Sequence, residues 1–214
     1  QNPLSHSDPS GHDGTTSNPI QDLVNMNLLP PGLTIFGKGV RMRSSGLSMM
    51  ASEATLEEGM RRFNCGNAMI AGAGAVAAGL NTVYDHSGAT DYARAGYSDP
   101  TTATLVDEVA ASFPTATDAK KFVAENAELW ARCAGKTFTL SSSDSPALTW
   151  DLGTPVTSGN RVTLHNTLTA HQGLPQHRIL AAKGNIVIDI SVLAKQLGDE
   201  PATIADRMLD RIPG

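Results

Sequence analysis

The hydrophobic pattern of this chain changes its period at residue 136, and that change constrains the fold more than any other feature of the sequence. Over residues 117–134, apolar side chains recur every three or four positions, as they do on an amphipathic helix. From residue 136 onward, apolar and polar residues alternate, as they do in strands with one buried face. One long helix followed by a run of strands predicts an α+β fold.

The helix expected over residues 117–134 has a start signal and a stop signal. Thr117 or Thr115 can supply the capping oxygen at its N-terminus, and Gly135 stands where the helix would end. Its apolar stripe runs as far as Cys133, whereas lysines and glutamates occupy the opposite side. Cys133 is therefore expected to be buried, which argues against an exposed reactive thiol.

Several further segments have strand character. Strands or extended segments are expected over residues 34–50, 101–113, 136–142, 147–156, 161–169 and 177–192. A short helix is expected after Thr55, and a last helix begins near Asp199 with Pro201 in its first turn. Together these elements predict an antiparallel sheet of about six strands with helices packed on one face.

Composition and charge fit one globular domain that follows a tether. Of the 214 residues, 40% are hydrophobic and 17% are charged, with a net charge of −5. Residues 1–19 hold hardly any large apolar side chain and are interpreted as a flexible tether, which leaves residues 20–214 as the domain. An acidic chain without a run of Lys or Arg argues against nucleic-acid binding, and no window of about 18 apolar residues would cross a membrane.

The two cysteines, Cys65 and Cys133, leave two alternatives open. Neither has a second cysteine or a histidine at ligand spacing, so a zinc site is not expected. The cysteines are either two buried free thiols or, in an exported protein, one disulfide. The place of Cys133 on the buried stripe of its helix favours the disulfide.

No group of residues indicates catalysis. The glycines near residue 74 form neither a dinucleotide-binding motif nor a phosphate-binding loop, and no nucleophile elbow occurs. Asp107 and Glu108 are neighbours on an expected strand, so they point to opposite faces and cannot act as a pair. Asp189 interrupts an apolar strand and is therefore exposed, cleft-facing or paired.

Three histidines, His165, His171 and His177, follow one another at intervals of six residues. A turn near residues 173–175 would make His171 and His177 approximate cross-strand neighbours. No carboxylate is placed beside these two histidines, and two ligands are fewer than a metal site needs, so no metal site is expected.

Three stretches carry a resemblance to a known family. They are residues 113–135 (FPTATDAKKFVAENAELWARCAG), 178–191 (RILAAKGNIVIDIS) and 199–213 (DEPATIADRMLDRIP). In this order and spacing they resemble the PknH-like extracellular sensor domain, found in mycobacterial receptor Ser/Thr kinases and related lipoproteins. The resemblance covers residues 28–213.

The resemblance implies an extracytoplasmic domain whose sheet and helices frame a cleft for an unidentified ligand, and which is not an enzyme. Relatives have two disulfides. Cys65 and Cys133 match one pair, whereas Gln176 and Leu193 fall about where the second pair should be. Loss of that second bond would leave the final hairpin less rigidly held.

The expected function is therefore that of a ligand-binding, sensor-type domain of a cell-envelope lipoprotein. Because the chain begins with Gln1, a signal peptide is expected to have been removed, with a lipid anchor upstream on the outer face of the plasma membrane. Arg178, Asn185 and Asp189 are the candidates for lining the cleft. We expect no cofactor, and we expect the domain to be a monomer. The alternative is a non-catalytic module of the envelope that binds another protein.

Overall fold

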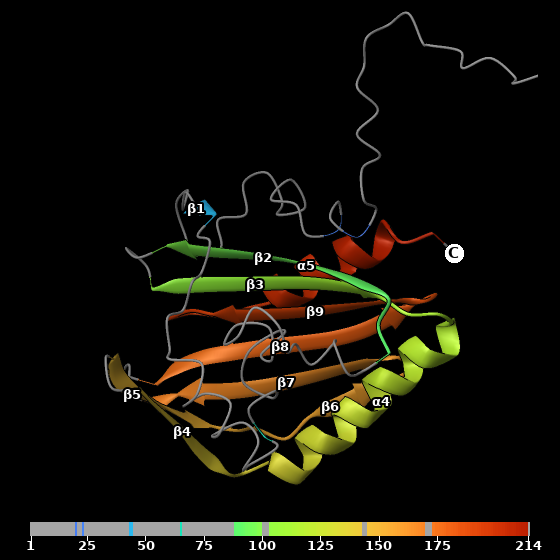
Figure 1. Cartoon of the computed structure of the whole chain (residues 1–214). Coiled ribbons are helices and arrows are strands. Elements are labelled where there is room, and N and C mark those ends of the chain that lie inside the picture. Colours follow the sequence, from blue (N-terminus) through green and yellow to red (C-terminus); the bar gives the residue numbers. More distant parts are fainter. Residues whose placement is uncertain are drawn as a thin grey trace, which may run out of the picture.

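The structure, a computed structural model, describes most of the chain from residue 88 onward. The described residues are 20, 23, 43–44, 65, 88–99, 103–142, 145–169 and 173–213. They form an antiparallel sheet with two helices packed on it, which confirms the α+β class (Figure 1). The expected tether at residues 1–19, the short helix after Thr55 and His171 lie outside the described residues.

Among the described residues the sheet has nine strands, more than the six or so expected. Along the sheet the strands run in the order β1-β2-β3-β9-β8-β7-β5-β4, and β6 pairs with β7 beside this path. Their bounds are β1 (Arg43–Ser44), β2 (Asp91–Asp99), β3 (Thr104–Ser112), β4 (Thr137–Ser142), β5 (Ser145–Asp151), β6 (Val156–Ser158), β7 (Arg161–Leu168), β8 (Leu174–Lys183) and β9 (Ile186–Leu193). The central position therefore belongs to β9 and its neighbours β3 and β8.

The prediction of one strand over residues 177–192 is wrong, because the chain reverses at Gly184 and Asn185 to form the β8–β9 hairpin. Gly184 has a φ of 56°, which glycine adopts without the steric cost borne by other residues. Two-residue turns that need positive φ are typical of tight hairpins. Beside the turn both strands are apolar on both faces, so the change of phase that the reversal causes leaves no visible break in the hydrophobic pattern.

The long helix, α4 (Ala116–Cys133), confirms its prediction to within a residue at each end. Thr115 is the N-cap, and its hydroxyl accepts a hydrogen bond of 3.1 Å from the Asp118 backbone N–H. Gly135 follows the helix with a φ of 72°. Phe122 and Trp130 lie on the buried stripe, which packs against β7, β8 and β9.

The second helix, α5 (Glu200–Asp210), lies on the opposite face of the sheet from α4, so the prediction of helices on one face is wrong (Figure 1). Its Ile204 and Met208 join a core cluster with Ile188 and Ile190 of β9. The α4 side chains join a different cluster, which contains Val187. The strands β8 and β9 are buried on both faces because each face is covered by a helix, and alternation of sheet faces then separates the two cores.

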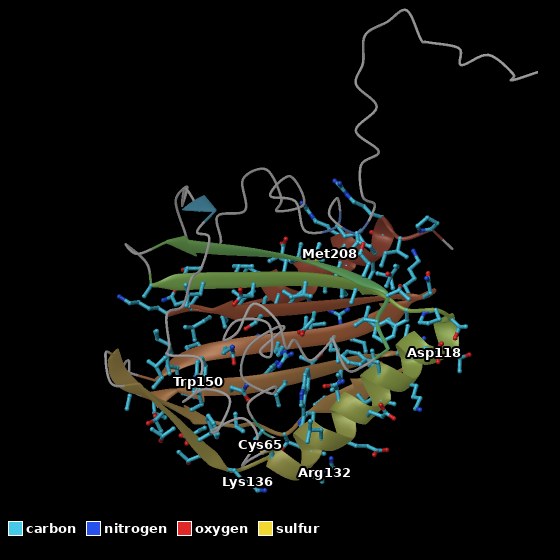
Figure 2. All side chains as sticks on the ribbon, viewed as in Figure 1. Cys65, Asp118, Arg132, Lys136, Trp150 and Met208 are labelled. Carbon is cyan, nitrogen blue, oxygen red and sulfur yellow. A yellow bond between two sulfur atoms is a disulfide. The ribbon has the colours of Figure 1, made fainter. Side chains whose placement is uncertain are left out.

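Cys65 and Cys133 form a disulfide, the alternative that the sequence favoured. Their Cα atoms are 5.7 Å apart, and both side chains are buried in the core cluster beneath α4. Figure 2 labels Cys65 close to the C-terminal end of α4. The bond ties Cys65, which lies between β1 and β2 in the sequence, to the C-terminal end of that helix.

We expect reduction of this disulfide to lower the free energy of unfolding by about 4 kcal/mol, because a bond that closes a long loop removes much of the entropy of the unfolded chain. The loop joins positions that are 68 apart in the sequence. Denaturant titrations with and without dithiothreitol measure the difference. The double variant Cys65→Ser with Cys133→Ser is the control, since its stability should not respond to the reductant. Equal stability of the oxidised and reduced wild-type protein would contradict the expectation.

Candidate functional site

The sheet face beneath α4 carries a row of buried polar side chains, which we call the polar belt. It consists of Asn166 from β7, Gln176 and Arg178 from β8, and Asp189 and Ser191 from β9, each at most 4% exposed. Asn166 lies directly opposite Gln176, and Arg178 lies opposite Ser191, so the register of the three strands brings the belt together. Burial of polar groups is costly unless they find hydrogen-bond partners, so such a belt requires specific contacts.

One half of the belt is a chain of neutral hydrogen bonds. The Asn166 side-chain amide donates to Gln176 Oε1 at 3.0 Å, and Gln176 Nε2 donates to Ser191 Oγ at 2.7 Å. Asn166 Oδ1 accepts a hydrogen bond from the Gly153 backbone N–H at 3.1 Å. A Cβ at Gly153 would overlap the carbonyl oxygen of His165, so glycine is needed for this close approach.

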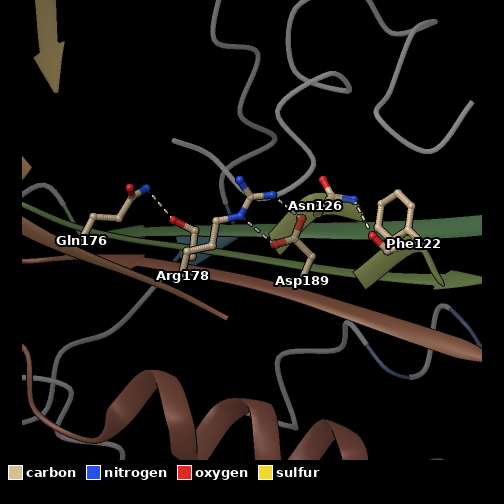
Figure 3. A network of polar contacts seen from close by, with 6 residues as sticks. Phe122, Asn126, Gln176, Arg178 and Asp189 are labelled. Carbon is tan, nitrogen blue, oxygen red and sulfur yellow. Dashed lines mark hydrogen bonds and ion pairs between the residues drawn. The ribbon is translucent and has the colours of Figure 1, made fainter. Parts of the chain in front are cut away.

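The other half of the belt is a buried ion pair (Figure 3). Arg178 donates to Asp189 through Nε at 2.9 Å and through Nη2 at 2.7 Å, which is the two-point geometry that guanidinium and carboxylate favour. The guanidinium also lies over the ring of Trp130 on α4, with its central carbon 4.6 Å from the ring centroid. Two contacts within the sheet and one from the helix therefore fix the Arg178 side chain.

Two hydrogen-bond donors beside this ion pair are buried without an acceptor. They are Arg178 Nη1 and Trp130 Nε1, for which no hydrogen-bond partner exists among the protein atoms that the structure describes. A buried donor left without a partner costs about 1–3 kcal/mol. Such atoms mark a place where an oxygen of a bound molecule would be favoured.

Of the three residues predicted to bind a ligand, the structure brings two together. Arg178 and Asp189 form the ion pair of the belt. Asn185 lies apart, at the β8–β9 turn, where its side chain donates to the Phe113 carbonyl at 2.9 Å and its own carbonyl accepts from the Phe113 N–H at 2.8 Å. It thereby holds the segment that leads into α4. A ligand-binding role for these residues remains a prediction.

Sequence patterns did not indicate Asn166, Ser191 or Trp130 as site residues, and they indicated Gln176 only as the place of a missing family cysteine. A signal existed for two of them, because Gln176 and Ser191 stand two residues from Arg178 and Asp189, at positions that share their sheet face. Gln176 and Leu193, expected at the site of a second family disulfide, are directly opposite each other on β8 and β9. Of these two positions, Gln176 belongs to the polar belt, where its side chain forms hydrogen bonds.

The opposite face of the sheet contains an isolated acid, Glu108 of β3. Its side chain is 0% exposed, and neither carboxyl oxygen has a hydrogen-bond partner among the described residues. Burial raises the pKa of the Glu108 carboxyl from 4.5 to about 8. Its neighbour Asp107 is also buried, at the alternate position of the strand. Glu108 is therefore a neutral acid in the apolar core beside α5 at physiological pH.

The histidine pair differs from the one expected. His177 lies directly opposite His165, and their rings stack with centroids 3.9 Å apart. The reason is the register of β7 and β8, which pairs Leu168 with Leu174 and therefore His165 with His177. Burial and the neighbouring His165 lower the pKa of His177, and the charge of Glu200 acts in the opposite direction.

Comparisons with known proteins agree with this fold. Residues 46–211 match the family described as the PknH-like extracellular domain. The chain belongs to the PknH-like extracellular domain family. A solved relative is the extracellular domain of PknH from Mycobacterium tuberculosis, with a TM-score of 0.55 and 27% identity over 60% of this chain and 67% of that one.

Curated relatives of this PknH-like chain are much longer than the part they share with it. Serine/threonine-protein kinases PknH of Mycobacterium bovis and Mycobacterium tuberculosis are each 26% identical over 107 residues. The match covers 50% of this chain but 18% and 17% of the kinases. Membership of a family of extracellular domains supports a sensor-type domain placed outside the cytoplasm. Neither described helix is long and apolar enough to span a bilayer.

The raised pKa of Glu108 predicts that the protein loses stability as the pH rises. Between about pH 4.5 and 8 the unfolded chain releases a proton that the folded protein keeps, so the free energy of unfolding falls by up to about 1.4 kcal/mol per pH unit and then levels off. Glu108→Gln should remove this contribution and make the protein more stable than the wild type at pH 8. Denaturant titrations across this pH range measure the free energy of unfolding of both proteins. The variant Glu128→Gln, at an exposed position, is the control. Parallel pH profiles for the wild type and Glu108→Gln would overturn the prediction.

We expect single substitutions in the buried ion pair to lower the free energy of unfolding strongly. Arg178→Met leaves the charge of Asp189 buried without its partner, and Asp189→Asn does the same to Arg178, so each should lower the free energy of unfolding by about 3–5 kcal/mol. The double variant Arg178→Met with Asp189→Leu should regain most of the loss, because it buries no unpaired charge. Chemical denaturation of all four proteins gives the coupling energy. Additive losses in the double variant would show that the two side chains do not act as a pair.

Proposed function

We propose that this domain recognises a small molecule or a component of the cell envelope in a cleft at the polar belt, and transmits the bound state without catalysing a reaction. The observation that carries the proposal is the pair of unpartnered buried donors, Arg178 Nη1 and Trp130 Nε1. They lie on the face of the sheet that α4 covers, beside an ion pair that fixes the guanidinium. Family membership supplies the sensor-type context.

The chemistry of the belt favours a ligand with oxygen acceptors and no requirement for strong negative charge. Asp189 already compensates the charge of Arg178, so a carbonyl or hydroxyl oxygen at Nη1 would complete its hydrogen bonding. The ring of Trp130 and the apolar side chains of the same core would contact the remainder of the molecule. A few fixed polar groups in apolar surroundings are typical of small-molecule sites.

We further propose that the domain is a monomer held at the outer face of the plasma membrane by a lipid anchor upstream of residue 1. The composition of residues 1–19 supports a tether, since they cannot bury enough apolar surface to form a core. Metabolic labelling of the full-length protein with a fatty-acid analogue in a mycobacterial host tests the anchor. Label that stays on the protein after detergent extraction supports it, and complete absence of label contradicts it.

The second candidate, a module that binds another protein, predicts a flat exposed apolar patch. Among the side chains that the structure describes, Val156 is the one large apolar residue that is exposed. A single exposed side chain of this kind is ordinary for a soluble domain and does not favour a protein partner.

Native mass spectrometry of the exported domain, purified from a mycobacterial host, tests the proposal with two matched variants. Trp130→Phe keeps an aromatic ring but removes the indole donor beside Arg178, so it should lower the retained fraction of a bound small molecule. Trp150→Phe removes another buried, unpartnered indole donor, on β5 and outside the belt, and should retain the molecule. Equal occupancy in both variants, or a protein as the retained species, would refute the proposal.

A further inference from the structure

The neutral hydrogen bonds of the polar belt all run in one direction. The Gly153 backbone N–H can only donate, so it fixes Oδ1 of Asn166 as an acceptor and turns the Asn166 amide nitrogen toward Gln176. Gln176 must then present Oε1 to Asn166 and donate through Nε2 to Ser191 Oγ. A backbone group at one end of the chain therefore decides the orientation of both amides and makes Ser191 an acceptor at the other end.

The last member of this chain, Ser191, has a hydroxyl hydrogen left to donate. Its oxygen accepts from Gln176 at 2.7 Å, so the hydrogen points away from that amide. None of the residues that the structure describes accepts this hydrogen. Hydrogen bonds that point the same way along a chain polarise one another, which makes the terminal hydroxyl a stronger donor.

Ser191 lies beside the two unpartnered donors of the belt. It is directly opposite Arg178 in the register of β8 and β9, so the two side chains are neighbours on the same face. Arg178 uses Nε and Nη2 for Asp189, and the fork shape of the guanidinium then turns Nη1 away from that carboxylate. Figure 3 shows the guanidinium between the side chains of Gln176 and Asp189. The donors that lack an acceptor in the described part of the chain, on Arg178, Trp130 and Ser191, therefore lie together.

The acceptors of the belt, by contrast, are already engaged. Oδ1 of Asn166, Oε1 of Gln176 and Oγ of Ser191 each receive a hydrogen bond along the chain. Both carboxylate oxygens of Asp189 receive one from Arg178, and the two charges balance each other. A bound oxygen at this place would therefore meet three donors, whereas each acceptor of the belt already has a partner.

We propose that the polar belt selects ligands that present an uncharged carbonyl group, such as a ketone, an amide or an ester, and that Ser191 determines this preference together with Arg178 and Trp130. A carbonyl oxygen accepts without donating, so it satisfies the donors and brings no hydrogen of its own. A hydroxyl group would bury a hydrogen beside engaged acceptors, and a carboxylate would bury a charge that the balanced ion pair does not compensate. The inference rests on the proposed function and names the ligand class that the function leaves open.

NMR titrations of the full chain with three probes that share a phenyl ring test this inference. The probes are acetophenone (a ketone), 1-phenylethanol (an alcohol) and benzoate (a carboxylate), and the Trp130 indole N–H signal reports contact with the belt. Acetophenone should shift this signal and bind at least about tenfold more tightly than either other probe, because one unsatisfied buried group costs about that factor. The signal of the second indole, Trp150, is the internal control and should not move.

Substitutions at Ser191 test its own part in the preference. Ser191→Ala removes the donor and should lower the affinity for acetophenone by about tenfold, whereas Ser191→Thr keeps a hydroxyl and should restore most of the affinity. Ser112→Ala is the matched control, because it removes a serine hydroxyl that is bonded to Thr90, outside the belt. Thermal unfolding of each variant shows whether it is folded. If Ser191→Ala does not fold, the comparison of the three probes on the wild type decides.

The possible outcomes separate this inference from the proposed function. Equal affinities for acetophenone and 1-phenylethanol, or tightest binding of benzoate, would overturn the inference and leave the proposed function standing. Unchanged binding of acetophenone to folded Ser191→Ala would overturn the role of Ser191. A Trp130 signal that stays in place with all three probes would refute both, because the unpartnered donors would then take no oxygen of an organic molecule.

Discussion

The pairing of β8 with β9 is the constraint on which the rest of the structure depends. Together with β3 they occupy the middle of the sheet, and α4 and α5 both contact β8 and β9, from opposite faces. Because side chains alternate between faces, the register of this hairpin determines what each helix meets. A slip of one residue between the two strands would turn either Arg178 or Asp189 toward the apolar core beside α5 and break the ion pair.

The polar belt shows how such a register can be made specific. Apolar contacts between strands are tolerant of small shifts, whereas the two hydrogen bonds from Arg178 to Asp189 and the chain through Gln176 form in one alignment only. A buried ion pair adds little net stability by comparison with a well-packed apolar pair. Its presence at the centre of the domain is therefore better explained by the specificity that it gives to the strand register.

Sequence patterns predicted the local elements well and the pairings poorly. The long helix, its cap at Thr115 and the last helix follow from signals within about twenty residues, because capping and amphipathic packing are local effects. The β8–β9 turn was missed because both strands are apolar on both faces beside it, so the change of phase at Gly184 and Asn185 is not visible in the pattern. The strand β2 was missed because its sequence, rich in Asp, Ala and Gly, has little intrinsic preference for a strand and depends on pairing with β3.

The sequence by itself determined the α+β class, the long helix with its N-cap and the burial of Cys133, since each depends on short-range periodicity. Only the tertiary structure decided that α4 and α5 cover opposite faces, that Asp189 is paired with Arg178, and that His177 faces His165 rather than His171. Each of these depends on strand register and on the exact residue where a turn reverses the chain. A change of one position there alters which side chains meet, while it leaves the hydrophobic pattern almost the same.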